Sequence, residues 1–184
     1  MMRVIAGEFR SRKLASVPGW DVRPTPDRMR ETLFSILMPV IEGAVFVDAY
    51  AGSGAVGIEA LSRGAVRCVF IERSTAALDV LRANIASLGL QSRVNVIRGK
   101  AAGALAGYKA DIVFLDPPYS EPEEYALSMA VVKAPLVIAQ HASKQLLEER
   151  YGKLARYRTV RQGDNTLSFY RLHAAGAEQD LLDE

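Results

Sequence analysis

The segment Asp116-Pro117-Pro118-Tyr119 carries the side chains best suited to chemistry. It follows an apolar run over residues 112–115 that is typical of a buried parallel strand. Open α/β sheets bind ligands at the carboxyl ends of such strands. Proline fixes φ and lacks an amide donor, so the carbonyls of Asp116 and Pro117 can point into a cleft. Two acceptors beside a flat ring suit a nucleobase edge that bears an NH2 group, although a proline-rich turn with an Asx cap would contain the same residues.

A glycine-rich turn supplies the second signal. A short apolar run ends in Asp48, and Gly52, Gly54 and Gly57 then fit the spacing G-x-G-x-x-G between a strand and a helix. Glycines at such a turn let the backbone approach a ligand closely, and the amides of the following helix face that ligand.

Glu72 supplies the third signal, because it ends the next apolar run and lies 24 positions after Asp48. An acid about 20 residues beyond a glycine turn is the expected partner of ribose hydroxyls, although a surface glutamate at a strand end would have the same position.

The identity of the cofactor follows from what each candidate would need. A dinucleotide would need the turn to hold a pyrophosphate. S-adenosylmethionine has no phosphate, but its α-amino group and sulfonium suit a nearby acid such as Asp48. The three signals together favour an S-adenosylmethionine-dependent amino methyltransferase.

Four stretches together resemble the bacterial 16S ribosomal RNA guanine-N2 methyltransferase family. They are Met2–Gly7, Arg23–Phe34 and the two motifs above, and the similarity covers roughly residues 2–172. The Arg-Pro-Thr-x-Asp-Arg-x-Arg-Glu-Thr-Leu-Phe stretch is the specific part, because many amino methyltransferases share the other motifs. The resemblance implies methylation of one guanine, at position 966 of the RNA, with 16S rRNA in the small subunit or its assembly intermediate as partner.

The predicted site follows from the motif positions. We expect Asp116, Pro117, Pro118 and Tyr119 to be catalytic, with two oxygens accepting from the target amine and the tyrosine stacking on the base. The residues expected to bind S-adenosylmethionine are Asp48, Tyr50, Ala51, Gly52, Ser53, Gly54, Glu72, Arg73, Lys100 and Ala101. Lys100 departs from the family, which usually has an acid there to accept from the adenine amino group. A lysine cannot accept, so we expect backbone groups near Lys100 and Ala101 to hold the adenine.

The N-terminal segment is the most basic part of the chain. Seven basic and three acidic side chains lie within residues 1–30, which gives +4 against +2 for the whole protein. A basic arm suits phosphate binding, although a solvated basic face would have the same composition. Arg23 and Arg28 are equally suited to ion pairs that hold the segment on the domain. The RNA-binding candidates are Arg10, Arg12, Lys13, Arg23, Arg28 and Arg30.

Strand and helix patterns alternate along the chain, which predicts an α/β fold with a Rossmann-like, mostly parallel sheet and helices on both faces. The resemblance implies seven strands, the last inserted antiparallel, and residues 155–160 and 166–172 fit a closing hairpin. The other strands are expected near 44–48, 67–72, 94–98, 111–115 and 135–140. A first helix is expected to begin at Asp27 and to include Leu33 and Leu37, and further helices are expected near 54–63, 75–89, 122–133 and 143–150.

Composition is that of a globular protein, with 184 residues, 49% hydrophobic and 24% charged. We expect a basic N-terminal extension with a β-hairpin over 1–26, a methyltransferase domain over 27–172, and a disordered acidic tail over 173–184. The single cysteine, Cys68, excludes an internal disulfide. The sequence shows no signal peptide, membrane-length apolar run or metal-ligand cluster. It therefore predicts a cytoplasmic protein without a metal, and we expect a monomer, although the sequence carries no signal for the oligomeric state.

Other functions stay open at this point. An adenine-N6 methyltransferase acting on DNA or RNA could use the same Asp-Pro-Pro-Tyr segment. A catalytically inactive RNA-binding protein of ribosome assembly is a second alternative, and Lys100 is its only support. A nicotinamide dehydrogenase is disfavoured because nothing marks a hydride site.

Overall fold

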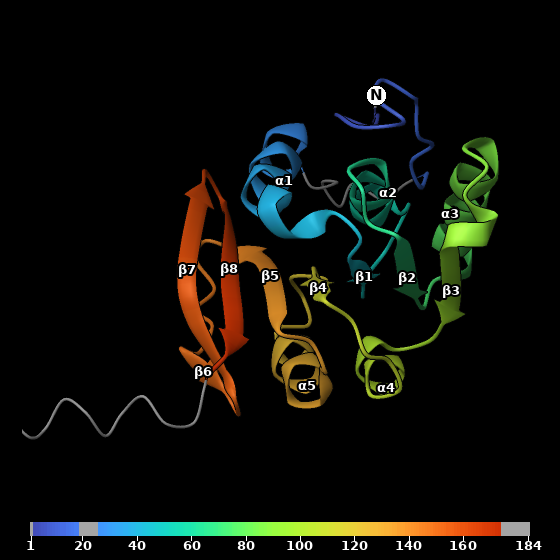
Figure 1. The fold of residues 1–184 in the computed structure, drawn as a ribbon. Helices are drawn as coiled ribbons and strands as arrows, with labels where there is room; N and C mark the ends of the chain where they lie inside the picture. Colours follow the sequence, from blue (N-terminus) through green and yellow to red (C-terminus); the bar gives the residue numbers. More distant parts are fainter. Residues whose placement is uncertain (1, 19–25, 174–184) are drawn as a thin grey trace, which may run out of the picture.

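The computed structural model describes residues 2–18 and 26–173, which contain one mixed β-sheet with helices on both faces (Figure 1). The strand order is β3-β2-β1-β4-β5-β8-β7-β6, with β1 to β5 parallel and the remaining pairs antiparallel. The strands are β1 (Val45–Asp48), β2 (Arg67–Glu72), β3 (Val94–Arg98), β4 (Ile112–Leu115), β5 (Leu136–Ala142), β6 (Arg150–Tyr151), β7 (Leu154–Gln162) and β8 (Asn165–Leu172).

Two layers of helices enclose the parallel half of the sheet (Figure 1). Alternate side chains of each strand reach opposite faces. Phe46 and Phe70 therefore belong to the core beneath α1, α2 and α3, whereas Val47 and Ile71 belong to the core beneath α4 and α5. The helices are α1 (Asp27–Ile41), α2 (Ala55–Ser62), α3 (Thr75–Ser87), α4 (Ala101–Leu105) and α5 (Glu123–Val131), with a 3-10 turn at Gln91–Arg93.

The predicted Rossmann-like fold is confirmed, and β8 lies antiparallel between β5 and β7. Within the described residues the sheet has eight strands rather than seven, because the two-residue β6 adds an edge to β7. The short helix α4 was not predicted.

The predicted helix over 143–150 is wrong. Its backbone groups bond instead to the β7–β8 hairpin, because the Ser143 amide donates to the Asp164 carbonyl at 2.8 Å and the Glu149 carbonyl accepts from the Arg156 amide at 2.8 Å. These bonds hold the segment as turns that lead into β6.

The N-terminal segment forms a short antiparallel ladder over residues 2–14 and lies beside α2 (Figure 1). The Val4 amide donates to the Arg12 carbonyl, and the Leu14 amide donates to the Met2 carbonyl, both at 3.0 Å. Val4 and Leu14 are buried in the same core as α1 and α2.

A buried carboxylate attaches this segment to α2. Glu59 is fully buried and accepts from the amides of Ile5 (2.8 Å) and Ala6 (3.0 Å) and from Nε of Arg63 (2.7 Å). The Ser62 side chain adds a bond to the Ala6 carbonyl at 2.5 Å. The helix that starts at the glycine turn therefore also anchors the N-terminal segment.

No helix within residues 2–18 and 26–173 is long and apolar enough to cross a membrane. The predicted acidic tail lies, apart from its first residue, outside the described residues, as does Arg23.

Replacing the anchoring carboxylate tests its contribution. Glu59→Leu should lower the free energy of unfolding by about 3 kcal/mol, since two amides and a guanidinium would lose their buried acceptor. Urea denaturation measures the change, and limited proteolysis should show faster cleavage within residues 2–14. The control is Glu8→Gln, which removes an exposed carboxylate paired with Arg93 and should change stability by less than about 0.5 kcal/mol. Equal effects of the two variants would contradict the anchoring role.

Candidate active site

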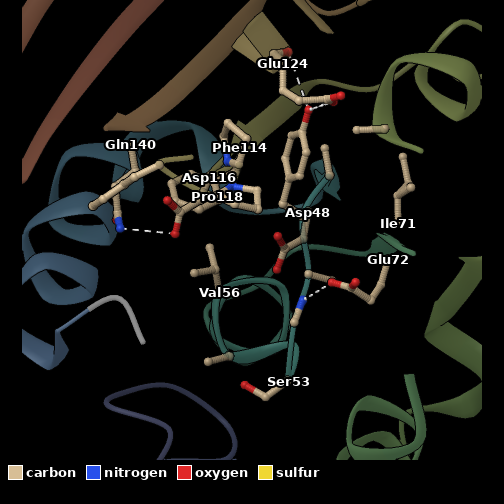
Figure 2. A pocket seen from close by; sticks show the side chains of 18 of the residues that line it. Asp48, Ser53, Val56, Ile71, Glu72, Phe114, Asp116, Pro118, Glu124 and Gln140 are labelled. Atoms are coloured by element: carbon tan, nitrogen blue, oxygen red, sulfur yellow. Dashed lines mark hydrogen bonds between the residues drawn. The ribbon is translucent and has the colours of Figure 1, made fainter. Parts of the chain in front are cut away.

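A cavity of about 960 Å³ opens where β1, β2, β4 and β5 end. Strand register brings these ends together, because Asp48 at the end of β1 pairs with Phe70 of β2 and with Phe114 of β4. Figure 2 shows Asp48, Glu72 and Asp116 around this cavity, each from the end of a different strand. Residues that are 68 positions apart in the sequence thus meet at one site.

Glu72 is held by three backbone amides. Its Oε2 accepts from Gly52 at 2.8 Å, and its Oε1 accepts from Arg73 at 2.8 Å and Ser74 at 2.7 Å. These bonds tie the glycine turn to the end of β2 and fix the carboxylate at the cavity wall. Each carboxylate oxygen can accept more than one hydrogen bond, so Glu72 can also accept from a pair of hydroxyls.

Asp48 is buried, and its Oδ2 accepts from the Gly57 amide at 3.0 Å. Burial raises the pKa of Asp48 to about 7; the Gly57 hydrogen bond opposes this rise, and the negative charge of Glu72 adds to it. A cation that enters the cavity would favour the charged carboxylate. Asp48 is therefore suited to respond to a positively charged ligand.

Tyr50, in the loop after β1, lines the cavity. Its hydroxyl donates to Oε2 of Glu124 at 2.8 Å and shares a second bond of 2.8 Å with the hydroxyl of Ser128. Both partners belong to α5, so this tyrosine connects the loop after β1 to the helix after the Asp-Pro-Pro-Tyr segment.

The three glycines of the turn have different structural roles. Gly52 lines the cavity, as do Ala51 and Ser53. Gly54 does not line it: this residue has φ +84°, and an added Cβ would lie 2.3 Å from Leu81. Gly54 therefore turns the backbone into α2, and its contact with the cofactor stays a prediction. Gly57 lets α2 pack on β2, since an added Cβ would lie 2.3 Å from the Phe70 ring.

The predicted catalytic segment borders the same cavity. Nε2 of Gln140, from the end of β5, donates to Oδ2 of Asp116 at 3.1 Å. The Pro118 carbonyl accepts from the Glu121 amide at 2.9 Å, which closes the turn after β4. All four residues line the cavity: Asp116, Pro117, Pro118 and Tyr119.

Tyr119 is held at the rim with half of its surface exposed. Its hydroxyl donates to Oδ1 of Asn165, at the start of β8, at 2.6 Å. An aromatic ring fixed at one end and exposed at a cavity mouth can stack on a planar ligand.

Arg73 lines the cavity and forms an ion pair with Glu121. One arm of the pair joins Nη1 to Oε2 at 2.8 Å. Lys100 and Ala101, at the start of α4, also line the cavity, and their contact with adenine stays a prediction.

The basic residues are not all placed for phosphate binding. Arg30 is fully buried, and its Nη2 donates to the Arg3 carbonyl at 2.9 Å and to Oδ1 of Asp27 at 2.6 Å. Its predicted contact with RNA is therefore wrong, because the guanidinium joins the N-terminal segment to α1. The candidates that are exposed are Arg10, Arg12, Lys13 and Arg28.

Several residues that line the cavity were not predicted from the sequence. Gln140 ends the apolar run of β5, and a polar residue at that edge of a parallel sheet was an available signal. Lys144, Arg161 and Asn165 come from the turn after β5 and from the β7–β8 hairpin. No motif connects these segments to the glycine turn. Among the described residues, no group of three His, Cys, Asp or Glu side chains is placed to hold a metal ion.

The residues present fit S-adenosylmethionine. A buried acid suits its cationic methionine part, and an acid with accepting capacity at the end of β2 suits its ribose. Together with the sheet and its inserted β8, these two acidic side chains define an S-adenosylmethionine-dependent methyltransferase with a Rossmann-like fold. The chain belongs to the family described as conserved hypothetical protein 95, whose model matches residues 2–171. The expected kinship with 16S rRNA methyltransferases is confirmed by the relatives of this chain.

Two relatives and one solved structure show the extent of the similarity. YlbH of Bacillus subtilis, named as a candidate rRNA methyltransferase, is 33% identical over an alignment of 183 positions that covers 92% of this chain and 98% of that protein. Ribosomal RNA small subunit methyltransferase D of Escherichia coli K12 is 44% identical over 120 residues, 64% of this chain and 60% of that protein. The structure of yhhF from E. coli, titled as a candidate methyltransferase, has a TM-score of 0.81 at 34% identity and covers 94% of this chain and 98% of its own.

The raised pKa of Asp48 generates a prediction for cofactor binding. Below pH 7 the carboxyl group is largely protonated and neutral, and above pH 7 it is charged. A cationic ligand binds the charged form better. Affinity for S-adenosylmethionine should therefore rise with pH through about 7, by up to about tenfold per pH unit, with release of protons. Isothermal titration in buffers of different ionisation enthalpy measures both effects.

Asp48→Asn is the matched control, because it keeps the shape of the side chain and removes its titration. The variant should bind more weakly at pH 8 and lose most of the pH dependence. An unchanged pH dependence in the variant would assign the effect to another group.

Proposed function

We propose that this chain transfers a methyl group from S-adenosylmethionine to the exocyclic N2 amine of a guanine in 16S rRNA, at position 966. The observation that supports this best is the convergence of Asp48, Glu72 and Asp116 on one cavity. The names of the relatives support small-subunit rRNA as the class of substrate. The working partner would be the small subunit or its assembly intermediate, in the cytoplasm.

The cofactor end of the cavity is built by the ends of β1, β2 and β3. Glu72 would accept from the ribose hydroxyls, and Asp48 would lie beside the cationic methionine part. Backbone groups near Lys100 and Ala101 would hold the adenine. When bound, the cofactor supplies an electrophilic methyl group.

The base end of the cavity contains the acceptors for the target amine. The lone pair of guanine N2 is delocalised into the ring, and positive charge builds on this nitrogen as its new bond forms. The Asp116 carboxylate and the Pro117 carbonyl would accept from its two hydrogens and stabilise that charge. The Pro118 carbonyl already accepts from Glu121, which leaves the carbonyl of Pro117 as the nearer choice. Holding the amine in line supplies further acceleration.

Tyr119 would stack on the base at the cavity mouth. A paired and stacked guanine could not reach Asp116, so the target must be flipped out or single-stranded. The exposed side of the Tyr119 ring, anchored through Asn165, suits such a base.

Basic side chains also lie at the cavity. Lys144 and Arg161 line it and are exposed. The N-terminal segment contributes Met2 and Val17 to the wall. Its exposed residues Arg10, Arg12 and Lys13 would extend the positive surface along the RNA backbone.

Removing the carboxylate tests the catalytic assignment. Asp116→Ala should lower kcat at least about 100-fold, because an acceptor for the developing charge is lost. S-adenosylmethionine affinity and thermal stability should stay close to those of the wild type. Tritium transfer to small subunits measures the rate, and Asp79→Ala on the exposed side of α3 is the control. Full activity of the Asp116 variant would contradict the assignment.

Charge reversal tests the RNA-binding surface. The double variant Arg10→Glu, Arg12→Glu should weaken RNA binding and reduce the slope of log K against log salt by about 1.5, since two phosphate contacts would be lost. Filter binding between 50 and 200 mM salt, a range over which such slopes are resolved, provides the measurement. The control reverses Arg67 and Lys109, which are exposed at the amino ends of β2 and β4. If both double variants had the wild-type slope, the N-terminal segment would lie outside the interface.

A further inference from the structure

Gln140 is a buried polar residue in the cavity wall that the proposed chemistry does not yet use. It lies near the end of β5 and is only 2% exposed. Its backbone carbonyl accepts from the hydroxyl of the buried Tyr125 at 2.5 Å. Its neighbour His141 points to the other face of the strand, where Nε2 lies 2.9 Å from the hydroxyl of Ser168. These contacts hold the Gln140 side chain beside Asp116 (Figure 2).

The orientation of its amide group follows from its partner. Oδ2 of Asp116 lies 3.1 Å from Nε2 of Gln140. A carboxylate only accepts, so the NH2 end must face Asp116 and the oxygen must face elsewhere. That oxygen, Oε1, is buried and accepts no hydrogen bond from the part of the chain that the structure describes.

A buried acceptor without a donor is rare in a folded protein. Gln140 lines the cavity, and the nearby wall residues Val56 and Phe114 have apolar side chains. Because Gln140 lines the cavity and its NH2 end faces Asp116, a ligand that reaches Asp116 is the candidate donor for Oε1.

We propose that Gln140 Oε1 accepts the ring N1–H of the target guanine and so selects guanine over adenine, an inference that rests on the proposed function. Guanine carries N1–H directly beside its N2 amine, so it presents adjacent donors to the two neighbouring acceptors, Asp116 and Gln140. Adenine carries an unprotonated N1 beside its N6 amine. With the adenine amine at Asp116, two acceptors would face each other at Gln140. The same glutamine would therefore position the Asp116 carboxylate and form a hydrogen bond that distinguishes guanine from adenine.

The test compares two target bases that share the reacting amine. 2-Aminopurine keeps the amine at C2 but lacks both N1–H and O6. Small subunits that carry guanine or 2-aminopurine at the target position are methylated in single turnover by wild-type protein, Gln140→Met and Gln140→Leu. Gln162→Met is the matched control, because Gln162 bonds to Thr32 at 2.5 Å and does not line the cavity.

Wild type and Gln162→Met should prefer guanine by about 100-fold or more, as sites built around a hydrogen bond to substrate do. Both Gln140 variants should be slower on guanine and should lower this preference to less than about tenfold. Because 2-aminopurine also lacks O6, the contribution of Gln140 is the part of the preference that these variants abolish. Melting temperature and cofactor affinity, which should not fall, show that the variants are folded.

The outcomes separate this inference from the proposed function. If wild-type protein leaves guanine-bearing subunits unmethylated, the proposed function itself fails. If it methylates guanine and 2-aminopurine at similar rates, only the assignment of Gln140 fails, and this comparison needs no variant. An undiminished preference in folded Gln140→Met or Gln140→Leu would also overturn it.

Discussion

The alignment of the parallel strands is the constraint on which the site depends. β1 pairs with β2 on one side and β4 on the other, and β4 pairs with β5. Because parallel strands in register end at one edge, the loops after all of them meet there. The apolar side chains of these strands are buried on both faces, so the sheet cannot slip by one residue without turning each core side chain to the other face. Packing of the core therefore positions the carboxylates at the strand ends, although these carboxylates are not part of the hydrophobic core.

Side chains of the site are also joined to the backbone around them. Glu72 binds the amides of Gly52, Arg73 and Ser74, and Asp48 binds the amide of Gly57. These bonds connect the carboxylates to the turn that follows β1. A preorganised site loses less entropy when a ligand binds. The bond from Gln140 to Asp116 extends the same arrangement to the base end of the cavity.

The sequence predicted the features whose signals are local. Apolar runs that end in an acid or in Asp-Pro-Pro-Tyr marked β1, β2 and β4, and the glycine turn marked the start of α2. Residues 143–150 have a helical composition, but their amides and carbonyls bond to residues near 156 and 164, which no local pattern reveals. Arg30 looked like a surface cation, yet its burial depends on contacts with Arg3, far away in the sequence. Arg161 and Asn165 reach the cavity because β8 is inserted beside β5.

The methylated nucleoside itself is the most direct test of the proposed reaction. Small subunits from cells that lack this protein are incubated with it and methyl-labelled S-adenosylmethionine, and the labelled nucleoside is identified by mass spectrometry and mapped on the RNA. We expect N2-methylguanine at a single nucleotide of the 16S rRNA, position 966. Label in N6-methyladenine, or no transfer to the RNA by protein that binds the cofactor, would contradict it.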